Sequence, residues 1–168
     1  VNILLVLPLL IPVTAAIVSM VGWNSRRAQR VLGVTGTALL FASGVVLLES
    51  VRRNGIQASQ MNAWPAPFGI TLVADLFSAI MVVIAGFMGF AVAVYSLATM
   101  DRQREAFGYY PLLHILLMGV CGAFLTGDLF NLFVFFEVLL AASYGLALHG
   151  SGAARVTAGL HYIVMNLA

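Results

Sequence analysis

Glu137 is the residue with the clearest chemical potential, because it stands inside a long apolar stretch that runs from residue 127 to residue 149. A charged side chain at membrane depth costs at least ~2.5 kcal/mol even on lenient insertion scales, and it usually faces a bundle interior, a partner or a water path. At the helical period, Glu137 shares one face with Phe130, Phe133, Ala141 and Tyr144. A carboxylate in such poorly solvating surroundings becomes able to bind a proton near neutral pH unless a cation approaches it. We therefore predict that Glu137 handles a proton or a cation; a carboxylate held by a fixed hydrogen bond is the structural alternative.

Three further residues are weaker candidates for the same path. Tyr144 shares the Glu137 face and could bridge a water chain, although a packing tyrosine fits as well. Asp75 stands near the start of an apolar segment, where the helix dipole favours an acid for purely structural reasons. His114 lies in another apolar segment and could relay protons or simply pack. For Asp75 and His114 both interpretations stay open.

The remaining polar residues offer little chemistry. His149 and His161 show no i, i+4 pairing, and Cys121 stands alone in an apolar run, so we expect neither a metal site nor a disulfide. Asp128 and Asn131 are expected to cap a helix. The chain carries no phosphate-binding loop, dinucleotide fingerprint or nucleophile elbow, so we predict no cofactor and no soluble-enzyme activity.

The composition indicates an integral membrane protein. Of the 168 residues, 62% are hydrophobic and 8% are charged, against about 25% charged in soluble domains. We predict an all-α fold, a polytopic transmembrane helical bundle in a single domain of residues 1–168. A crossing needs ~20 apolar residues, which predicts five helices and the start of a sixth, at approximately 3–22, 31–50, 70–98, 109–126, 129–149 and 153–168.

The arginines predict the orientation. Six of the eight lie in the first, third and fifth connections, and Arg is enriched on the cytoplasmic side of membranes. The N-terminus should therefore be outside, and the second connection, with Trp64 as an interfacial anchor, should lie on the outer surface. The mixed-charge turn at 101–105 is expected to be solvated and nothing more.

Small residues predict how two segments pack. Gly119, Ala123 and Gly127 recur every four residues, which forms a stripe for close helix contact. The turn after Gly127 is tight, so the segments 109–126 and 129–149 should be antiparallel neighbours.

Three stretches, residues 64–75, 108–114 and above all 126–140, resemble the D subunit of the multisubunit Mrp-type Na⁺/H⁺ antiporters. The shorter Phe-Phe-Glu-Val theme at 135–138 is shared with antiporter-like subunits of respiratory complex I and membrane hydrogenases. The resemblance implies inverted helical repeats with charged residues along the midplane. It also implies that Glu137 pairs with a lysine on a later helix, and this chain contains no lysine. We accordingly expect an N-terminal fragment of a longer subunit that does not transport ions alone.

The resemblance implies a subunit of a bacterial plasma-membrane antiporter that exchanges Na⁺ or a similar monovalent cation for protons, with other subunits of the complex and the lipid bilayer as partners and no nucleic acid. One alternative is a proton-translocating subunit of a complex I-like or hydrogenase enzyme. Another is a structural helical module in which Glu137 only packs.

Overall fold

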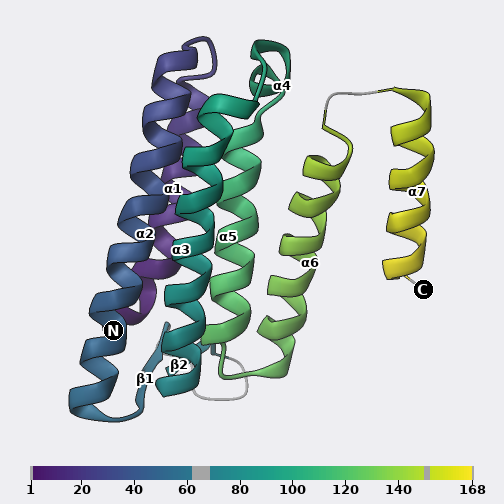
Figure 1. Cartoon of the computed structure of the whole chain (residues 1–168). Coiled ribbons are helices and arrows are strands. Elements are labelled where there is room, and N and C mark those ends of the chain that lie inside the picture. Colours follow the sequence, from purple (N-terminus) through teal and green to yellow (C-terminus); the bar gives the residue numbers. More distant parts are fainter. Residues whose placement is uncertain (1, 62–68, 150–151, 168) are drawn as a thin grey trace.

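The chain folds into helices that run up and down beside one another (Figure 1). The computed structural model describes residues 2–61, 69–149 and 152–167. Four of the helices are long and apolar enough to cross a membrane, namely α1 (Ile3–Val21), α2 (Arg26–Asn54), α3 (Leu76–Thr99) and α6 (Leu129–Ala147). The shorter apolar helix α5 (Tyr109–Leu125), the single turn α4 (Arg102–Ala106) and the C-terminal α7 (Ala153–Leu167) complete the helices of the described chain.

Polar caps fix where most of these helices begin. The caps are Asn2, Ser25, Asp75, Asp101 and Asp128, and each side chain accepts a hydrogen bond from a backbone N–H two or three residues later. The first N–H groups of a helix have no partner within the helix, and a capping oxygen supplies one. The expected capping role of Asp128 is confirmed, because its carboxylate accepts from the Asn131 N–H at 2.7 Å.

A short hairpin between α2 and α3 departs from the expected all-α fold. Strand β1 (Gln57–Gln60) pairs antiparallel with β2 (Thr71–Ala74), with Ala58 opposite Val73. The prediction of one helix over 70–98 was therefore wrong at its start: residues 71–74 pair with β1, and the helix begins at Leu76 after its cap. The predicted anchor Trp64 lies outside the described residues.

The hairpin also holds the end of the bundle together. The Gly127 N–H donates to the Thr71 carbonyl at 2.8 Å, so β2 is bonded to the turn that joins α5 to α6. At the other strand, the Asn2 N–H donates to the Ser59 hydroxyl at 3.0 Å. Because of these bonds, the starts of α1, α3 and α6 are fixed relative to one another.

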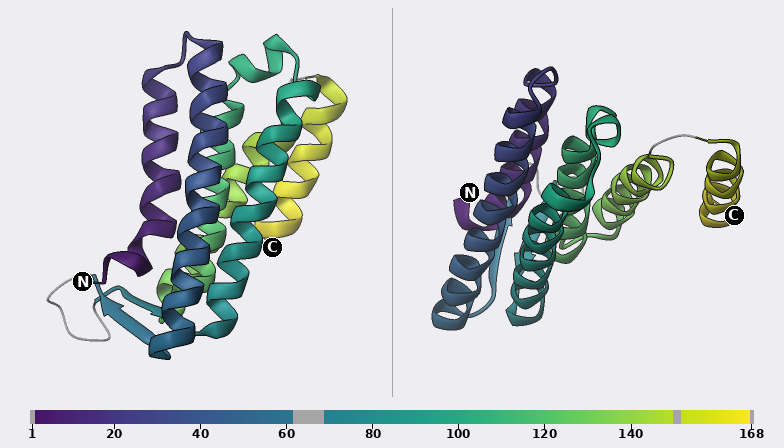
Figure 2. Two further views of the ribbon diagram at one scale, coloured as in Figure 1. Left: turned by 60° about the vertical axis from the view of Figure 1, so that its left-hand side comes forward. Right: turned by 45° about the horizontal axis from the view of Figure 1, so that its top comes forward.

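Helix α5 occupies the centre of the bundle and contacts α1, α2, α3 and α6 (Figures 1 and 2). Its buried residues include Tyr110, His114, Cys121 and Leu125. Helix α2 accommodates two polar rings of α5 with glycines: a Cβ added at Gly33 would lie 2.1 Å from the Tyr110 ring. One added at Gly36 would lie 2.6 Å from His114 Cε1. These glycines let α2 approach α5 closely.

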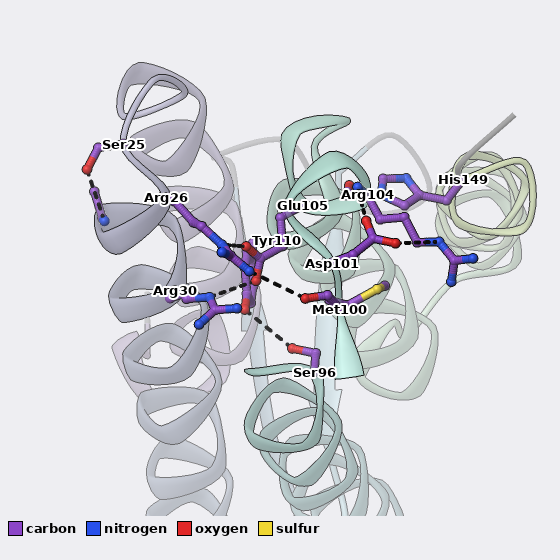
Figure 3. A network of polar contacts seen from close by, with 11 residues as sticks. Ser25, Arg26, Arg30, Ser96, Met100, Asp101, Arg104, Glu105, Tyr110 and His149 are labelled. Atoms are coloured by element: carbon purple, nitrogen blue, oxygen red, sulfur yellow. Dashed lines mark hydrogen bonds and ion pairs between the residues drawn. The ribbon is translucent and has the colours of Figure 1, made fainter. Parts of the chain in front are cut away.

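The mixed-charge turn at 101–105 is not simply solvated, which corrects the sequence prediction. The Glu105 side chain is only 3% exposed and forms ion pairs with Arg26 and with Arg30, the latter at 2.7 Å (Figure 3). A carboxylate is buried at low cost only when it is paired and hydrogen-bonded. The turn is thereby bound to the start of α2.

Candidate functional site

Helix α6 carries the principal candidate, Glu137, and two glycines of α5 decide how α6 is turned. A Cβ added at Gly119 would lie 2.7 Å from Leu139 Cβ, and one at Gly122 would lie 2.2 Å from the Phe135 ring. The face of α6 that contains Phe135 and Leu139 therefore packs against α5. The predicted small-residue stripe holds at Gly119, but Gly127 lies against Val73 of β2 and not against α6.

Glu137 lies on the opposite side of α6. It is two residues from both Phe135 and Leu139, which is about 200° around a helix of 3.6 residues per turn. The side chain is exposed, as are Phe130 (75%) and Phe133 (62%) on the same face. Glu137 is eight residues after Leu129, so it sits about 12 Å along the helix axis from its start. The carboxylate thus points away from the bundle at mid-depth.

The uncovered state of α6 distinguishes it from its neighbours. In the most apolar 18-residue segment of α6, only 6% of the residues are buried, against 33–39% in the corresponding segments of α1, α2 and α3. Helix α7 lies beyond α6, on the side away from the main bundle (Figure 2). The two helices meet where the rings of Tyr144 and Tyr162 are 5.2 Å apart. Most of the Glu137 face remains free within the described chain.

Glu137 has no partner of opposite charge among the described residues. The five ion pairs that these residues form involve Glu49, Asp101 and Glu105. Tyr144, about two helical turns after Glu137 on the same face, has a hydroxyl that is buried without a hydrogen-bond partner in the described chain. Of the predicted site residues, only Glu137 and Tyr144 are brought to one face.

His114 is placed elsewhere, in the core between α1, α2 and α5. It is fully buried, with Gly36 and Ala15 close by and the Leu32 backbone nearby, yet neither ring nitrogen completes a hydrogen bond within the described residues. Because Glu137 points away from α5, the structure does not bring the two residues together. A direct proton transfer between them has no geometric support.

Asp75 acts as a cap at the end of the bundle. Its carboxylate accepts from the Ser78 N–H at 2.7 Å, while its own N–H donates to the Ser78 hydroxyl at 2.9 Å, a reciprocal capping box. The hydrogen bonds from Ser78 lower the pKa of Asp75. This geometry accounts for Asp75 structurally and keeps its carboxylate ionised.

The other histidines make backbone contacts. His149 Nε2 lies against the Arg104 carbonyl, and His161 Nδ1 is 2.9 Å from the Thr157 carbonyl. Within the described chain, no group of three or more His, Cys, Asp or Glu side chains could hold a metal ion. Cys121 is buried and free.

The sequence prediction missed the cluster formed by Glu105, Arg26 and Arg30. Arg26 and Arg30 are four residues apart, so they share one helix face. An acid in a connection on the same side of the membrane is the signal that could have suggested the cluster. Tyr110 is within electrostatic reach of all three charges and accepts a hydrogen bond from the Ser96 hydroxyl at 3.4 Å (Figure 3).

Comparison with known proteins gives consistent relatives over nearly the whole chain. The D subunit of a probable K⁺/H⁺ antiporter of Rhizobium meliloti is 44% identical over 98% of the chain. The D subunits of the Na⁺/H⁺ antiporters of Alkalihalophilus pseudofirmus and Bacillus subtilis are 40% and 38% identical over 99%. The chain is a homologue of these antiporter D subunits. No protein-family model matches it.

Solved structures agree with this relationship. The Mrp complex from Dietzia contains a chain that is 29% identical, with a TM-score of 0.88 over 99% of this chain. An archaeal membrane-bound sulfane sulfur reductase shares the fold, with a TM-score of 0.87 at 24% identity. The chain spans about a third of the length of these relatives, 31–34%. Its apolar helices and bacterial antiporter relatives make it a multi-pass protein of the plasma membrane.

Proposed function

We propose that the chain is part of a membrane subunit of a multisubunit antiporter, in which Glu137 binds and releases protons in exchange for a monovalent cation. The observation that carries this proposal is an exposed carboxylate at mid-depth of α6, on a face that the described chain leaves uncovered. Ionisable residues at membrane depth face a bundle interior or a water path. The uncovered face therefore becomes an interior surface in the complete assembly.

The basic partner of Glu137 is proposed to come from residues that this chain does not contain. The sequence has no lysine, and no described arginine pairs with Glu137. A nearby cation favours the charged carboxylate, and its withdrawal favours protonation. Withdrawal of such a basic group would let Glu137 bind a proton, and its return would make Glu137 release the proton. Tyr144 is proposed to line the same path. For Asp75 we propose a capping role, supported by its reciprocal hydrogen bonds with Ser78, and for His114 a packing role in the buried core.

The cation is proposed to be a monovalent alkali ion, because the relatives are named as K⁺/H⁺ and Na⁺/H⁺ antiporter subunits. We further propose that α1, α2, α3, α5 and α6 all cross the membrane, that α7 begins a sixth crossing, and that the N-terminus is outside. The supporting observation is that Arg26, Arg30, Arg102 and Arg104 gather at one end of the bundle. Such clustering marks the cytoplasmic side.

The test is Glu137→Gln in the complete subunit, assembled in its complex and assayed in inside-out vesicles. A pH-sensitive dye reports proton movement when Na⁺ or K⁺ is added after the membrane has been energised. We expect the cation-dependent proton efflux to fall to background, since glutamine has the shape of glutamate but carries no titrating group. Glu137→Asp should retain part of the exchange, because the carboxylate survives.

The matched control is Glu49→Gln, which removes a carboxylate at the exposed end of α2. Exposed pairs of this kind contribute about 0–1 kcal/mol, so assembly and exchange should both stay near the wild-type level. Unchanged exchange in a fully assembled Glu137→Gln complex would reject the proposed role and favour the structural module.

The fold shared with the sulfane sulfur reductase makes a redox-driven subunit the second candidate. The same vesicles separate the two. Cation-driven proton exchange with no electron donor or acceptor present supports the antiporter. Exchange that appears only when a redox substrate is supplied supports the redox-driven subunit.

A further inference from the structure

A hollow at the arginine-rich end of the bundle is independent of the Glu137 face. It has a volume of about 340 Å³ and lies between the α1–α2 connection, the first turn of α2 and α4. The lining includes Trp23, Asn24, Arg26, Gln29, Arg102 and Glu105. Helix α1 ends at Val21 and α2 begins at Arg26, so the hollow sits where membrane-spanning helices end. This is the level of lipid headgroups in a bilayer.

The charges around the hollow favour an anion. Glu105 has one carboxylate oxygen against Arg26 and the other 2.7 Å from Arg30 Nε, so its charge is already neutralised (Figure 3). Arg102 has no ion pair or side-chain hydrogen bond with any other described residue. Three guanidinium groups against one carboxylate leave a net charge of +2. Guanidinium groups bind phosphate through strong charge-assisted hydrogen bonds.

The hollow also contains a buried amide oxygen, which needs a hydrogen-bond donor that a fully ionised anion does not supply. Gln29 is only 5% exposed, and its Nε2 donates to the Ser19 carbonyl at 2.5 Å. A carbonyl can only accept a hydrogen bond, so the amide nitrogen of Gln29 must face the Ser19 carbonyl. The amide oxygen, Gln29 Oε1, therefore takes no part in that bond. Gln29 Oε1 is buried and has no donor within the described residues. An unsatisfied buried acceptor is costly, and a ligand hydroxyl would satisfy it.

One wall of the hollow is an aromatic ring suited to the membrane surface. Trp23 is 47% exposed, and its ring lies over Gly108, where an added Cβ would be 2.8 Å from Trp23 Cη2. Gly108 has a φ of 83°, a left-handed conformation that glycine adopts readily, so no side chain displaces the ring. Tryptophan is enriched at the interface between lipid and water.

We propose that this hollow binds the headgroup of an anionic phospholipid that carries hydroxyl groups, of the phosphatidylglycerol type. Arg26 and Arg102 bind the phosphate, Gln29 Oε1 accepts a hydrogen bond from a headgroup hydroxyl, and Trp23 borders the glycerol backbone. The acyl chains extend into the bilayer beside α1 and α2. The site does not depend on which side of the membrane this end occupies, because both leaflets present headgroups.

The test measures lipid retention by the complete subunit in its purified complex. After delipidation, the complex is incubated with phosphatidylglycerol or phosphatidylcholine, and bound lipid is counted by native mass spectrometry. Wild type should retain phosphatidylglycerol and not phosphatidylcholine. Arg102→Ala should weaken retention about tenfold through loss of a charge-assisted bond, and Gln29→Leu about fivefold through loss of a neutral one.

The matched control is Arg27→Ala, which removes an equal charge from the same end at an exposed position outside the hollow. It should leave retention unchanged. Equal losses in Arg27→Ala and Arg102→Ala would overturn the proposal in favour of general surface attraction. Displacement of the lipid by millimolar inorganic phosphate would show that phosphate alone is the ligand. Loss of a companion subunit from Arg102→Ala, with lipid retention intact, would show a protein interface instead.

Discussion

Asp75 and Glu137 are carboxylates that belong to apolar segments of the chain, but their surroundings in the structure differ. Asp75 precedes its helix and receives hydrogen bonds from Ser78, so its ionised form is stabilised. Glu137 stands in mid-helix and receives none from the described residues. Position relative to the helix start therefore separates an acid that caps a helix from the acid for which we propose a role in proton transfer.

Asp75 leads to a prediction about acid stability. Its folded-state pKa lies below the ordinary value of 3.8, so the stabilisation is complete above that value and is lost as the pH falls through the lowered pKa. Asp75→Ala should cost about 1 kcal/mol at pH 7, which is typical for a lost cap. The gap in unfolding temperature between wild type and variant should then narrow below pH 3.8.

Asp75→Asn is the control for this titration. Asparagine caps helices as well as aspartate but does not ionise. The difference between Asp75→Asn and Asp75→Ala should therefore be the same at every pH. A wild-type advantage over Asp75→Ala that persists unchanged through pH 3 would contradict the assignment.

At the residue scale, sequence patterns predicted local roles better than distant ones. The capping role of Asp128 was readable because its partner, Asn131, is three residues away. Glu105 was misread as solvated because Arg26 and Arg30 are 79 and 75 residues distant along the chain. Only the fold brings these three charges together.

At the scale of elements, two glycines of α5 make the same kind of contact with different parts of α6. A Cβ at Gly122 would meet only the flexible ring of Phe135, at 2.2 Å. A Cβ at Gly119 would meet Leu139 Cβ at 2.7 Å and the Leu139 backbone N at 2.9 Å. The first clash can be relieved by trimming a side chain, whereas the second requires a movement of α6.

Double-mutant cycles test this difference. Gly122→Ala and Phe135→Ala should be less destabilising together than the sum of the two single changes, by about 0.5–3 kcal/mol. Gly119→Ala and Leu139→Ala should add almost independently, because the backbone clash remains. The readout is the thermal unfolding of the assembled complex. Equal coupling in the two cycles would contradict this packing of α6 on α5.

The hairpin shows why the ends of the helices were harder to predict from the sequence than the helices themselves. Residues 71–74 are mostly apolar and continue the apolar run of α3, so the length of that run placed them in the predicted helix. Their partner strand, Gln57–Gln60, is largely polar and offered no alternating signal. The hydrogen bond from Gly127 to Thr71, which the sequence does not reveal, also holds β2 at this end of the bundle.

At the scale of the whole molecule, the arginine-rich end predicts an inside and an outside. In intact cells, a membrane-impermeant maleimide should label Gln60→Cys in β1 but not Arg27→Cys in α2. Permeabilisation should expose Arg27→Cys. Both positions are exposed in the structure, and Cys121 is buried and should stay unlabelled. The reverse pattern would place the N-terminus inside.

The sequence predicted much of the helix order and pairing, but it did not predict the rotation of α6 about its own axis. The order of apolar segments and the antiparallel pairing of α5 with α6 followed from composition and a tight turn. The rotation of α6 depends on which of its side chains pack against Gly119 and Gly122 of α5. In the structure these are Leu139 and Phe135, and the sequence alone does not identify them. The separation of His114 from Glu137 follows from this rotation.

The central place of α5 has a consequence for biogenesis. Helices α1, α2 and α3 leave the ribosome first, and until α5 arrives the notches at Gly33 and Gly36 have nothing to fill them. Tyr110 and His114, in turn, would meet lipid if α5 entered the bilayer alone, and polar groups are costly there. We therefore expect α5 to move from the translocon into the bilayer only when α1, α2 and α3 are already inserted next to it. The core should accordingly form only after α5, the fourth apolar helix, has been synthesised.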